Sequence, residues 1–218
     1  QIVGTVAHTA LERFYRQWSE ADAEGGALPG TEDLVSIAKD VFVAESRRVG
    51  GVDLSQFEQI ESQLRSGYER LHEEGAEVMM IEENAPFAYG RDSGDDEPHR
   101  FDAKLDRVDR TPGGGFRIID YKTGKAWKSL LEPKKDDLQL GIYALALAEK
   151  LEIDADELNG SAEYWVFSSG VRGVIDFEEL DIAKVRKRID KAITGMLAGD
   201  FAPKSSCEGL CRTFLKRD

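Results

Sequence analysis

Apolar residues recur at helical spacing through the first third of the chain. Between Gly4 and Glu20 one face of the expected helix carries Val6, Ala10, Phe14 and Trp18. Thr31 is the expected N-cap of a second helix that ends near Val49, because threonine favours this position. A third helix is expected from Leu54 to Glu73. Residues 1–75 are therefore predicted to form an N-terminal helical lobe.

The pattern becomes strand-like after residue 75. Strands are expected over 76–89 with a break, over 100–110 and over 116–121, followed by an amphipathic helix over 137–150, strands over 161–168 and 171–177, and a helix over 180–198. This order predicts an α/β fold, a mixed sheet with helices on its faces. We expect one domain, 1–218, with a sheet core over 76–199 and a C-terminal tail over 200–218.

The composition is that of a globular domain. The chain has 218 residues, 33% of them charged and 41% hydrophobic, which is enough for one sizeable core. No apolar run approaches the roughly 18 residues of a membrane span, and no signal peptide is visible. We expect no membrane partner, and because Cys207 and Cys211 do not suggest a secreted disulfide framework, we expect a cytoplasmic protein. Because the chain opens on Gln1 rather than Met, we interpret it as a fragment of a longer protein.

The net charge is −13, which taken alone argues against a nucleic-acid partner. The charge is uneven, however. Acidic residues concentrate in 73–96 and 149–157, whereas lysines and arginines concentrate between Arg100 and Lys135. The local charge around residues 100–135 therefore remains compatible with a phosphate ligand.

The segment from Lys104 to Lys122 carries the candidate chemistry. Asp106 lies in one expected strand and Asp120 ends the next, and the Gly-rich turn Thr111–Gly115 joins them. A tight hairpin would bring the two aspartates together, and Lys122 shares a strand face with Asp120. Two carboxylates and an ammonium group suit a hard divalent cation and a phosphate. The alternative is a plain salt bridge between Asp106 and Lys122 or Arg107.

Three further residues are ambiguous on physical grounds. Gln139 and Tyr143 are spaced i, i+4 on one helix face, where tyrosine is most often a core residue but the glutamine can bind a phosphate or orient Lys122. His8 lies in an expected helix, where a lone histidine is more often structural. His72 and His99 lie in polar stretches typical of a surface, and we assign them no role.

Together these residues resemble a known family. The motifs are Gly4-x3-His8-x2-Leu11-Glu12, Lys104-Leu105-Asp106-Arg107-Val108-Asp109, Ile119-Asp120-Tyr121-Lys122-Thr123-Gly124-Lys125 and Gln139-Leu140-x2-Tyr143. They are similar to the RecB-type nuclease domain of the PD-(D/E)XK superfamily, which includes AddB-like and Cas4-like nucleases. The resemblance spans His8 to Cys211. It implies a restriction-endonuclease-like fold and a Mg²⁺- or Mn²⁺-dependent deoxyribonuclease, the exonuclease module of a helicase–nuclease that processes DNA ends in double-strand-break repair.

The resemblance also implies roles for particular residues. The expected metal ligands are Asp106, Asp120 and the backbone carbonyl of Tyr121, with His8 as a further ligand. Lys122 is the expected catalytic lysine, positioned by Gln139 and Tyr143. Glu82 or Glu83 is expected beside the metal as a supporting or secondary ligand. The residues expected to contact DNA are Arg107, Lys125 and Lys128.

The chain departs from the family pattern in two places. Lys104 stands where the family often has glycine, two residues before the first metal aspartate. Many members also hold a [4Fe–4S] cluster through four cysteines, but this chain has only Cys207 and Cys211. Since an incomplete set cannot hold such a cluster, we expect none here. The two cysteines are a remnant, part of a set completed elsewhere, or ordinary free thiols.

Two other functions remain open at this point. The domain could be a catalytically silent DNA-binding or scaffolding module of the same fold, although His8, Asp106, Asp120 and Lys122 are all present. It could also be a metal-dependent phosphatase of small molecules, which would need a closed pocket rather than an open groove. Expected partners are DNA, single-stranded or with duplex ends, a helicase domain in the parent chain and a partner subunit. The sequence does not give cleavage polarity or a preference for ends.

Overall fold

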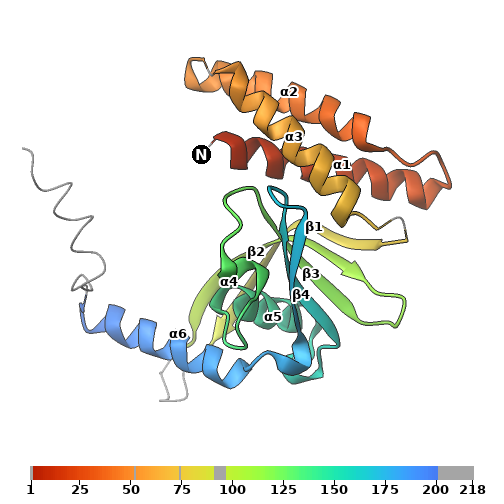
Figure 1. Ribbon diagram of the computed structural model, residues 1–218. Coiled ribbons are helices and arrows are strands. Elements are labelled where there is room, and N and C mark those ends of the chain that lie inside the picture. The colour runs from red at the N-terminus through yellow and green to blue at the C-terminus, as the bar shows by residue number, and fades with distance from the viewer. Residues whose placement is uncertain (1, 52, 74, 91–96, 201–218) are drawn as a thin grey trace, which may run out of the picture.

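The computed structural model describes residues 2–51, 53–73, 75–90 and 97–200 (Figure 1). Three helices come first, then three strands, two helices, two strands and a helix. Their bounds are α1 Ile2–Glu24, α2 Thr31–Val49, α3 Leu54–Leu71, β1 Glu77–Tyr89, β2 His99–Arg110, β3 Phe116–Lys122, α4 Lys128–Leu131, α5 Leu138–Leu151, β4 Gly160–Val166, β5 Val171–Asp176 and α6 Ile182–Leu197. The predicted order is confirmed, and the four-residue α4 is an addition to it.

The five strands form one mixed sheet in the order β1-β2-β3-β4-β5. The pairs β1–β2, β2–β3 and β4–β5 are antiparallel, as hairpins must be. β3 and β4 run parallel, and α4 and α5 form the crossover between them. The expectation of a mixed sheet flanked by helices, with a helical region ahead of it, is confirmed.

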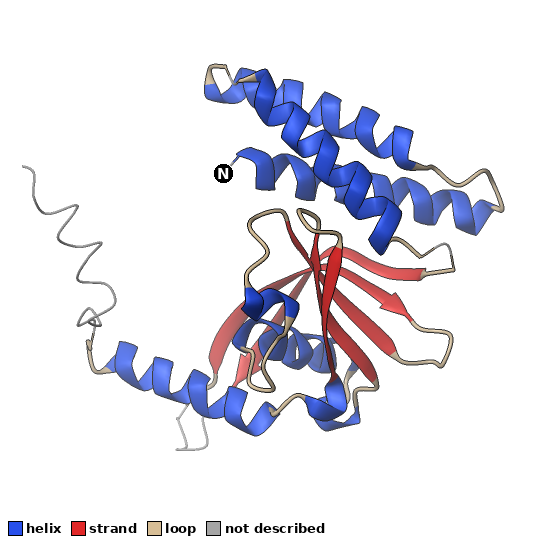
Figure 2. Ribbon diagram, viewed as in Figure 1, coloured by secondary structure: helices blue, strands red, loops and turns tan. Residues whose placement is uncertain are grey.

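The sheet separates two hydrophobic cores, which Figure 2 shows as helices on either side of the strands. Ile118 packs with α5 and α6, whereas its neighbour Ile119 packs with α1, α2 and α3. The alternation of strand side chains produces this division. β3 is therefore buried on both faces, and its polar end at Asp120–Lys122 emerges between the two helical layers.

Two local predictions are wrong. Thr31 is the first helical residue of α2, and Gly30 is the N-cap, because the Gly30 N–H donates to the Asp33 carboxylate. The first strand also has no break, since β1 runs from Glu77 to Tyr89 with only a register shift between Val78 and Met80. β1 is an edge strand, and a proline such as Pro86 is tolerated there.

In the described ranges, no helix is both long and apolar enough to cross a membrane. Cys207 and Cys211, and with them the predictions about a cluster, lie outside the described residues.

Candidate metal centre

The site forms where β2 and β3 separate. Their pairing runs from Arg110–Phe116 to Arg107–Ile119 and ends there. Beyond this point the Tyr121 N–H donates to Asp106 Oδ2 at 2.9 Å, so a side chain takes the place of a strand partner. Asp106 and Asp120 come next in the same register, and they are only 8% and 2% exposed. The sheet thus places two buried carboxylates beside a gap in its own hydrogen bonding.

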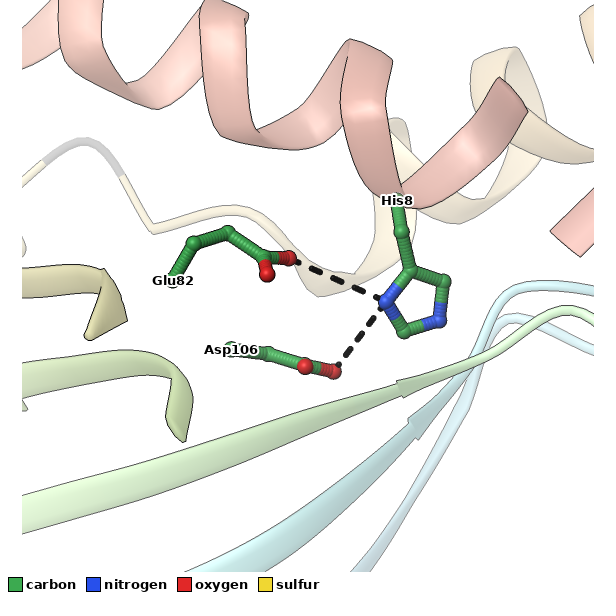
Figure 3. Close-up of side chains that lie close together, drawn as sticks. All are labelled: His8, Glu82 and Asp106. Carbon is green, nitrogen blue, oxygen red and sulfur yellow. Dashed lines mark ion pairs between the residues drawn. The ribbon is translucent and has the colours of Figure 1, made fainter. Parts of the chain in front are cut away.

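His8 of α1 reaches this gap from the helical lobe (Figure 3). Its Nδ1 lies 3.4 Å from Asp106 Oδ2 and 3.9 Å from Glu82 Oε1. One ligand atom from each of the three residues lies within 4.8 Å of the other two. The opposite ring nitrogen, Nε2, is 3.0 Å from the Tyr121 carbonyl oxygen. A histidine ligand typically donates its second N–H to such an acceptor, so this contact leaves Nδ1 to face an ion.

Glu82 is brought to the site by an unusual backbone conformation. It has a φ of +49° within β1, in the left-handed region that side chains other than glycine rarely adopt. Its neighbours Ile81 and Glu83 stay in register with β2. Glu83 pairs with Lys150 of α5 at 2.7 Å, whereas Glu82 contacts His8 and Lys104. Of the two glutamates that the sequence suggested, the structure therefore brings Glu82 to the centre and not Glu83.

The charges of this cluster stabilise one another. Burial alone would lower the pKa of His8, but hydrogen bonds and charges from Asp106 and Glu82 outweigh it and raise the pKa to about 10. Burial alone would raise the pKa of Glu82, yet the neighbouring cationic side chains of His8 and Lys104 bring it below its usual value. The imidazolium therefore occupies a place suited to a cation, and an ion that binds here must displace its proton.

Asp120 belongs to a second, adjoining network. Its Oδ2 lies 2.5 Å from Lys122 Nζ, and its Oδ1 accepts from Gln139 Nε2 at 2.6 Å and from the Tyr143 hydroxyl at 3.3 Å. Gln139 Oε1 accepts from Lys122 Nζ at 3.1 Å. One amide thus holds the carboxylate and the ammonium group together. Burial, aided by the charge of Asp106, raises the pKa of Asp120 to about 6 although Lys122 opposes the shift.

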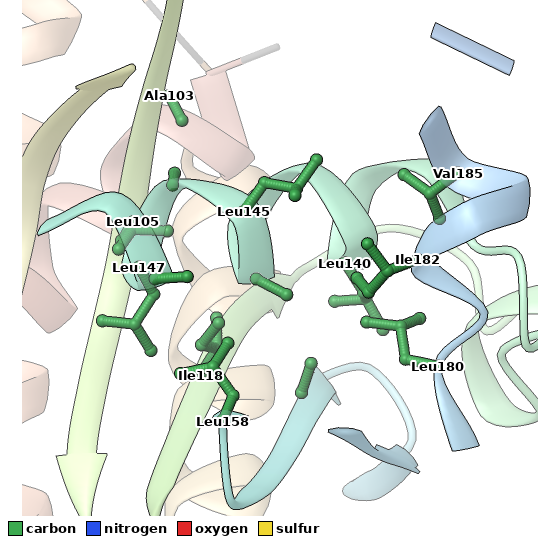
Figure 4. Packing of buried hydrophobic residues seen from close by; sticks show 14 of the residues in the cluster. Ala103, Leu105, Ile118, Leu140, Leu145, Leu147, Leu158, Leu180, Ile182 and Val185 are labelled. Carbon is green, nitrogen blue, oxygen red and sulfur yellow. The ribbon is translucent and has the colours of Figure 1, made fainter. Parts of the chain in front are cut away.

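The start of α5 fixes Gln139 in place. Asp137 caps this helix, its Oδ1 accepting from the Gln139 and Leu140 amides and from the Tyr164 hydroxyl at 2.8 Å. Figure 4 shows the buried apolar side chains around α5, and the cluster includes Leu140, Leu145 and Leu147 of this helix with Leu105 and Ile118 of the sheet. Asp137 and Tyr164 were not among the residues predicted from the sequence, although an aspartate just before an apolar helix is a capping signal.

These residues fit a hard divalent cation. Glu82 Oε1 is buried and has no hydrogen-bond partner among the described residues, although it lies beside His8 and Asp106. A buried polar atom without a partner is costly, and a metal ion would supply that partner. Carboxylate oxygens with one imidazole nitrogen are donors that Mg²⁺ and Mn²⁺ accept. The donor set is His8, Glu82 and Asp106, and Asp120 adjoins it, whereas the Tyr121 carbonyl lies on the Nε2 side of the His8 ring.

The structure corrects two assignments. Arg107 has no exposed surface, and both its Nε and Nη2 donate to Asp109 at 2.6 Å, so it cannot contact DNA. His72 is not a surface residue, because it accepts from or donates to the Tyr15 hydroxyl at 3.2 Å and stacks on Tyr68. By contrast, Lys125 and Lys128 are exposed.

Comparisons with known proteins bear on the family of this chain. The model of the PD-(D/E)XK nuclease superfamily matches residues 1–213. The Gene 69 protein of Mycobacterium phage L5 is 30% identical over 97 residues, which are 41% of this chain and 29% of that protein. The chain thus spans less than a third of that curated relative.

Among solved structures, the crystal structure of SSO0001 matches 87% of this chain and 74% of its own, at 16% identity and a TM-score of 0.36. That likeness is too distant to support an inference. The family match covers nearly the whole chain and includes every residue of the metal centre. The chain belongs to the PD-(D/E)XK nuclease superfamily.

Proposed function

We propose that this domain is a Mg²⁺- or Mn²⁺-dependent deoxyribonuclease, and that it serves as the exonuclease module of a RecB- or AddB-like helicase–nuclease. The observation that carries the proposal is the contact between two networks. The cluster of His8, Glu82 and Asp106 adjoins the Asp120–Lys122 ion pair at the gap between β2 and β3. One network suits a metal ion, and the other places an ammonium group where a phosphate bound to that ion would lie.

The ligands of the ion would be His8 through Nδ1, Glu82, Asp106 and Asp120. The Tyr121 carbonyl oxygen lies against Nε2, on the opposite side of the imidazole ring, so in this geometry it orients His8 and is out of reach of an ion on Nδ1. When bound, the ion supplies Lewis-acid activation of a phosphate and of a water molecule. The buried carboxylates exclude bulk water from their own side of the site, since both aspartates are less than a tenth exposed. An open position for substrate remains on the side of Lys122, which is partly exposed.

Lys122 acts on the charge that develops at the phosphate. Its ammonium group is held by Asp120 and by Gln139 Oε1, so its position is set before substrate arrives. Gln139 is a positioning residue, because it touches both members of the ion pair and is itself anchored by Tyr143 at 3.0 Å. The lysine therefore stabilises the transition state more than the bound substrate.

Cleavage of end-labelled DNA tests the proposal. Single-stranded and duplex DNA, labelled at the 5′ or the 3′ end, are incubated with the protein and Mg²⁺, Mn²⁺ or a chelator. We expect cleavage that needs the ion, with mononucleotides or short products released progressively from an end. Release from uniformly internal sites would contradict the exonuclease assignment, and no cleavage under any condition would overturn the nuclease assignment.

A Lys122→Ala variant separates a nuclease from a silent DNA-binding module. We expect Mn²⁺ affinity by calorimetry to stay near wild type while turnover falls by about 10²–10³-fold, the usual loss for a group that acts on transition-state charge. Arg110→Ala is a matched control, since Arg110 is a cation on β2 that pairs with Glu77 outside the site. Equal DNA binding with no turnover in wild type as well would favour the silent module.

A further inference from the structure

One exposed aromatic side chain lies just after β3, the strand that carries Asp120 and Lys122. The chain has three tryptophans, and Trp18 and Trp165 are 2% and 0% exposed, whereas Trp127 is 60% exposed. Tryptophan is on average strongly buried, since its large apolar ring gains from leaving water. Packing in the hydrophobic core therefore does not account for Trp127.

Trp127 lies close to the proposed chemistry along the chain. It follows Lys122 by five residues, so the two Cα atoms are at most about 18 Å apart. It is the N-cap of α4, and Ser129 of α4 lines a surface cavity of about 440 Å³ together with Gln139 and Tyr164. The same cavity includes Lys134 and Arg188 in its wall. α4 thus borders an open space that leads to the glutamine holding Lys122.

The charge around Trp127 is opposite to that of the whole chain. Residues 122–135 contain five lysines and one glutamate, although the net charge of the chain is −13. Lys125 Nζ lies 4.6 Å from the centroid of the Trp127 ring, within the range of a cation–π contact. Lys128 is exposed as well, and pairs only at the surface with Glu132 at 3.3 Å. An aromatic face with ammonium groups beside it matches a base and the phosphates on either side of it.

We propose that Trp127, with Lys125 and Lys128, is a stacking platform for an unpaired base of the strand that is cleaved, and that the domain consequently takes single-stranded DNA in preference to a blunt duplex. The proposal rests on the nuclease function above and adds its substrate class. A base within a duplex has both faces covered by its neighbours, so it cannot stack on a protein ring without being unpaired and unstacked. A base in a single strand offers its face at little cost, and the ring accepts any of the four bases.

Tryptophan fluorescence tests the platform without any turnover. With Ca²⁺ or no metal in place of Mg²⁺, a single-stranded dT20 oligonucleotide is added to the intact chain. We expect strong quenching, because Trp127 is the exposed tryptophan and stacking on a base quenches its emission. Trp127→Phe should still bind but lose the quenching, and the same length of blunt duplex should quench wild type only weakly.

Affinity gives an independent measure. Trp127→Ala should weaken dT20 binding by at least about fivefold, the lower limit for losing one base–aromatic stack. Trp127→Phe should retain most of the affinity. Leu54→Ala, which removes an apolar residue that is 74% exposed on α3, is the matched control and should change nothing. Lys125→Ala should lower the slope of log affinity against log salt by about 0.7, as expected for one lost phosphate contact on a single strand.

The outcomes separate this inference from the proposed function. If wild type cleaves DNA but Trp127→Ala binds and cleaves dT20 normally, the platform is wrong and the nuclease assignment stands. Equal quenching by duplex and single strand would overturn the substrate preference. Quenching that follows protein concentration instead of DNA would show a second copy of the chain on Trp127 and would also overturn it. If wild type neither binds nor cleaves any DNA, both proposals fail together.

Discussion

Two neighbouring residues of β2 carry opposite charges and lead to opposite kinds of cluster. Asp106 joins His8 and Glu82 in a cluster that leaves a buried carboxylate oxygen without a hydrogen bond. Arg107 is enclosed, with Asp109 bonded to its guanidinium group and the Tyr15 ring centroid 3.8 Å from its Cζ. The Asp106 cluster suits a bound ion, whereas in the Arg107 cluster the charge of the guanidinium is paired within the protein.

The difference shows what separates a binding site from a structural ion pair. Around Arg107 the charge is paired within the folded chain, with Asp109 only 1% exposed and Trp165 on a further side of the guanidinium, although Nη1 has no hydrogen-bond partner among the described residues. Around Asp106 the charges are held in part by a proton on His8 that an ion can replace. Asp106 and Arg107 are both buried, but their burial has different consequences. Substitutions in the Arg107 cluster should change stability, and substitutions in the metal centre should change cleavage.

The largest effect is expected at Asp120. Asp120→Asn should lower DNA cleavage by at least about 10³-fold, because the variant loses a charged group that touches both the metal centre and Lys122. Without metal it should melt at a higher temperature than wild type. The pKa of Asp120 is raised to about 6 by burial, so its ionised form costs stability above that pH. The stability gain from the neutral amide is at most about 3 kcal/mol.

Cleavage rates with Mg²⁺ and thermal unfolding with chelator check both parts of this prediction. Near-normal cleavage by the variant would show that Asp120 is not part of the catalytic site. Asp102→Asn is a matched control, since Asp102 is an exposed aspartate on β2 that pairs with Arg100.

Arg107 should show the reverse behaviour. Arg107→Met leaves Asp109 buried without its partner, so we expect a loss of about 3–5 kcal/mol in the free energy of unfolding. Adding Asp109→Leu should restore part of it, because the orphaned charge is then removed. Denaturant unfolding measures this, and Mn²⁺ affinity measured on the folded protein should stay unchanged. A metal affinity that fell with stability would break the distinction between the two clusters.

The contrast also explains what sequence could and could not predict. The periodicity of Val6–Trp18 and the apolar pair Ile118-Ile119 determined the helices and the buried strand, and both follow from local spacing. The pattern could not tell Arg107 from an exposed DNA-binding residue. Its burial depends on Tyr15 and Trp165, which are distant in the chain. Long-range packing of this kind leaves no local signal.

The same limit applies inside the site. The aspartates and Lys122 are linked by one hairpin, so their proximity follows from strand geometry. Glu82 rather than Glu83 reaches the metal centre because Glu82 has a positive φ, and the sequence does not predict a positive φ at a glutamate. The exposure of Trp127 was equally invisible, because the ring alone predicts burial.

His8 offers a pH test of the cluster at Asp106. Its pKa in the metal-free protein is raised to about 10 by Asp106 and Glu82, which outweigh the effect of burial. Metal binding must then release a proton at neutral pH, and Mn²⁺ affinity should rise by up to about tenfold per pH unit toward pH 10. Calorimetry in buffers of different ionisation enthalpy measures the proton. His8→Ala should bind more weakly and lose the pH dependence, and an unchanged dependence would exclude His8 as a ligand.

The smallest effect is expected at His72, on the side of the Arg107 cluster. Burial, aided by the charge of Arg107, lowers the pKa of His72 to about 4. The unfolded chain therefore binds a proton more readily than the folded one, so this contribution to stability is complete above about pH 6.5 and is lost as the pH falls toward 4. Because His72 is only partly buried, we expect a loss of about 1–2 kcal/mol after allowing for solvent screening.

His72→Gln should flatten the fall in melting temperature between pH 6.5 and 5, where few carboxylates titrate. His99→Gln, a change at the first residue of β2, is the matched control and should leave the fall as it is. An equal slope in wild type and His72→Gln would show that protonation of His72 does not destabilise the protein in this pH range, and that the fall in melting temperature has another cause.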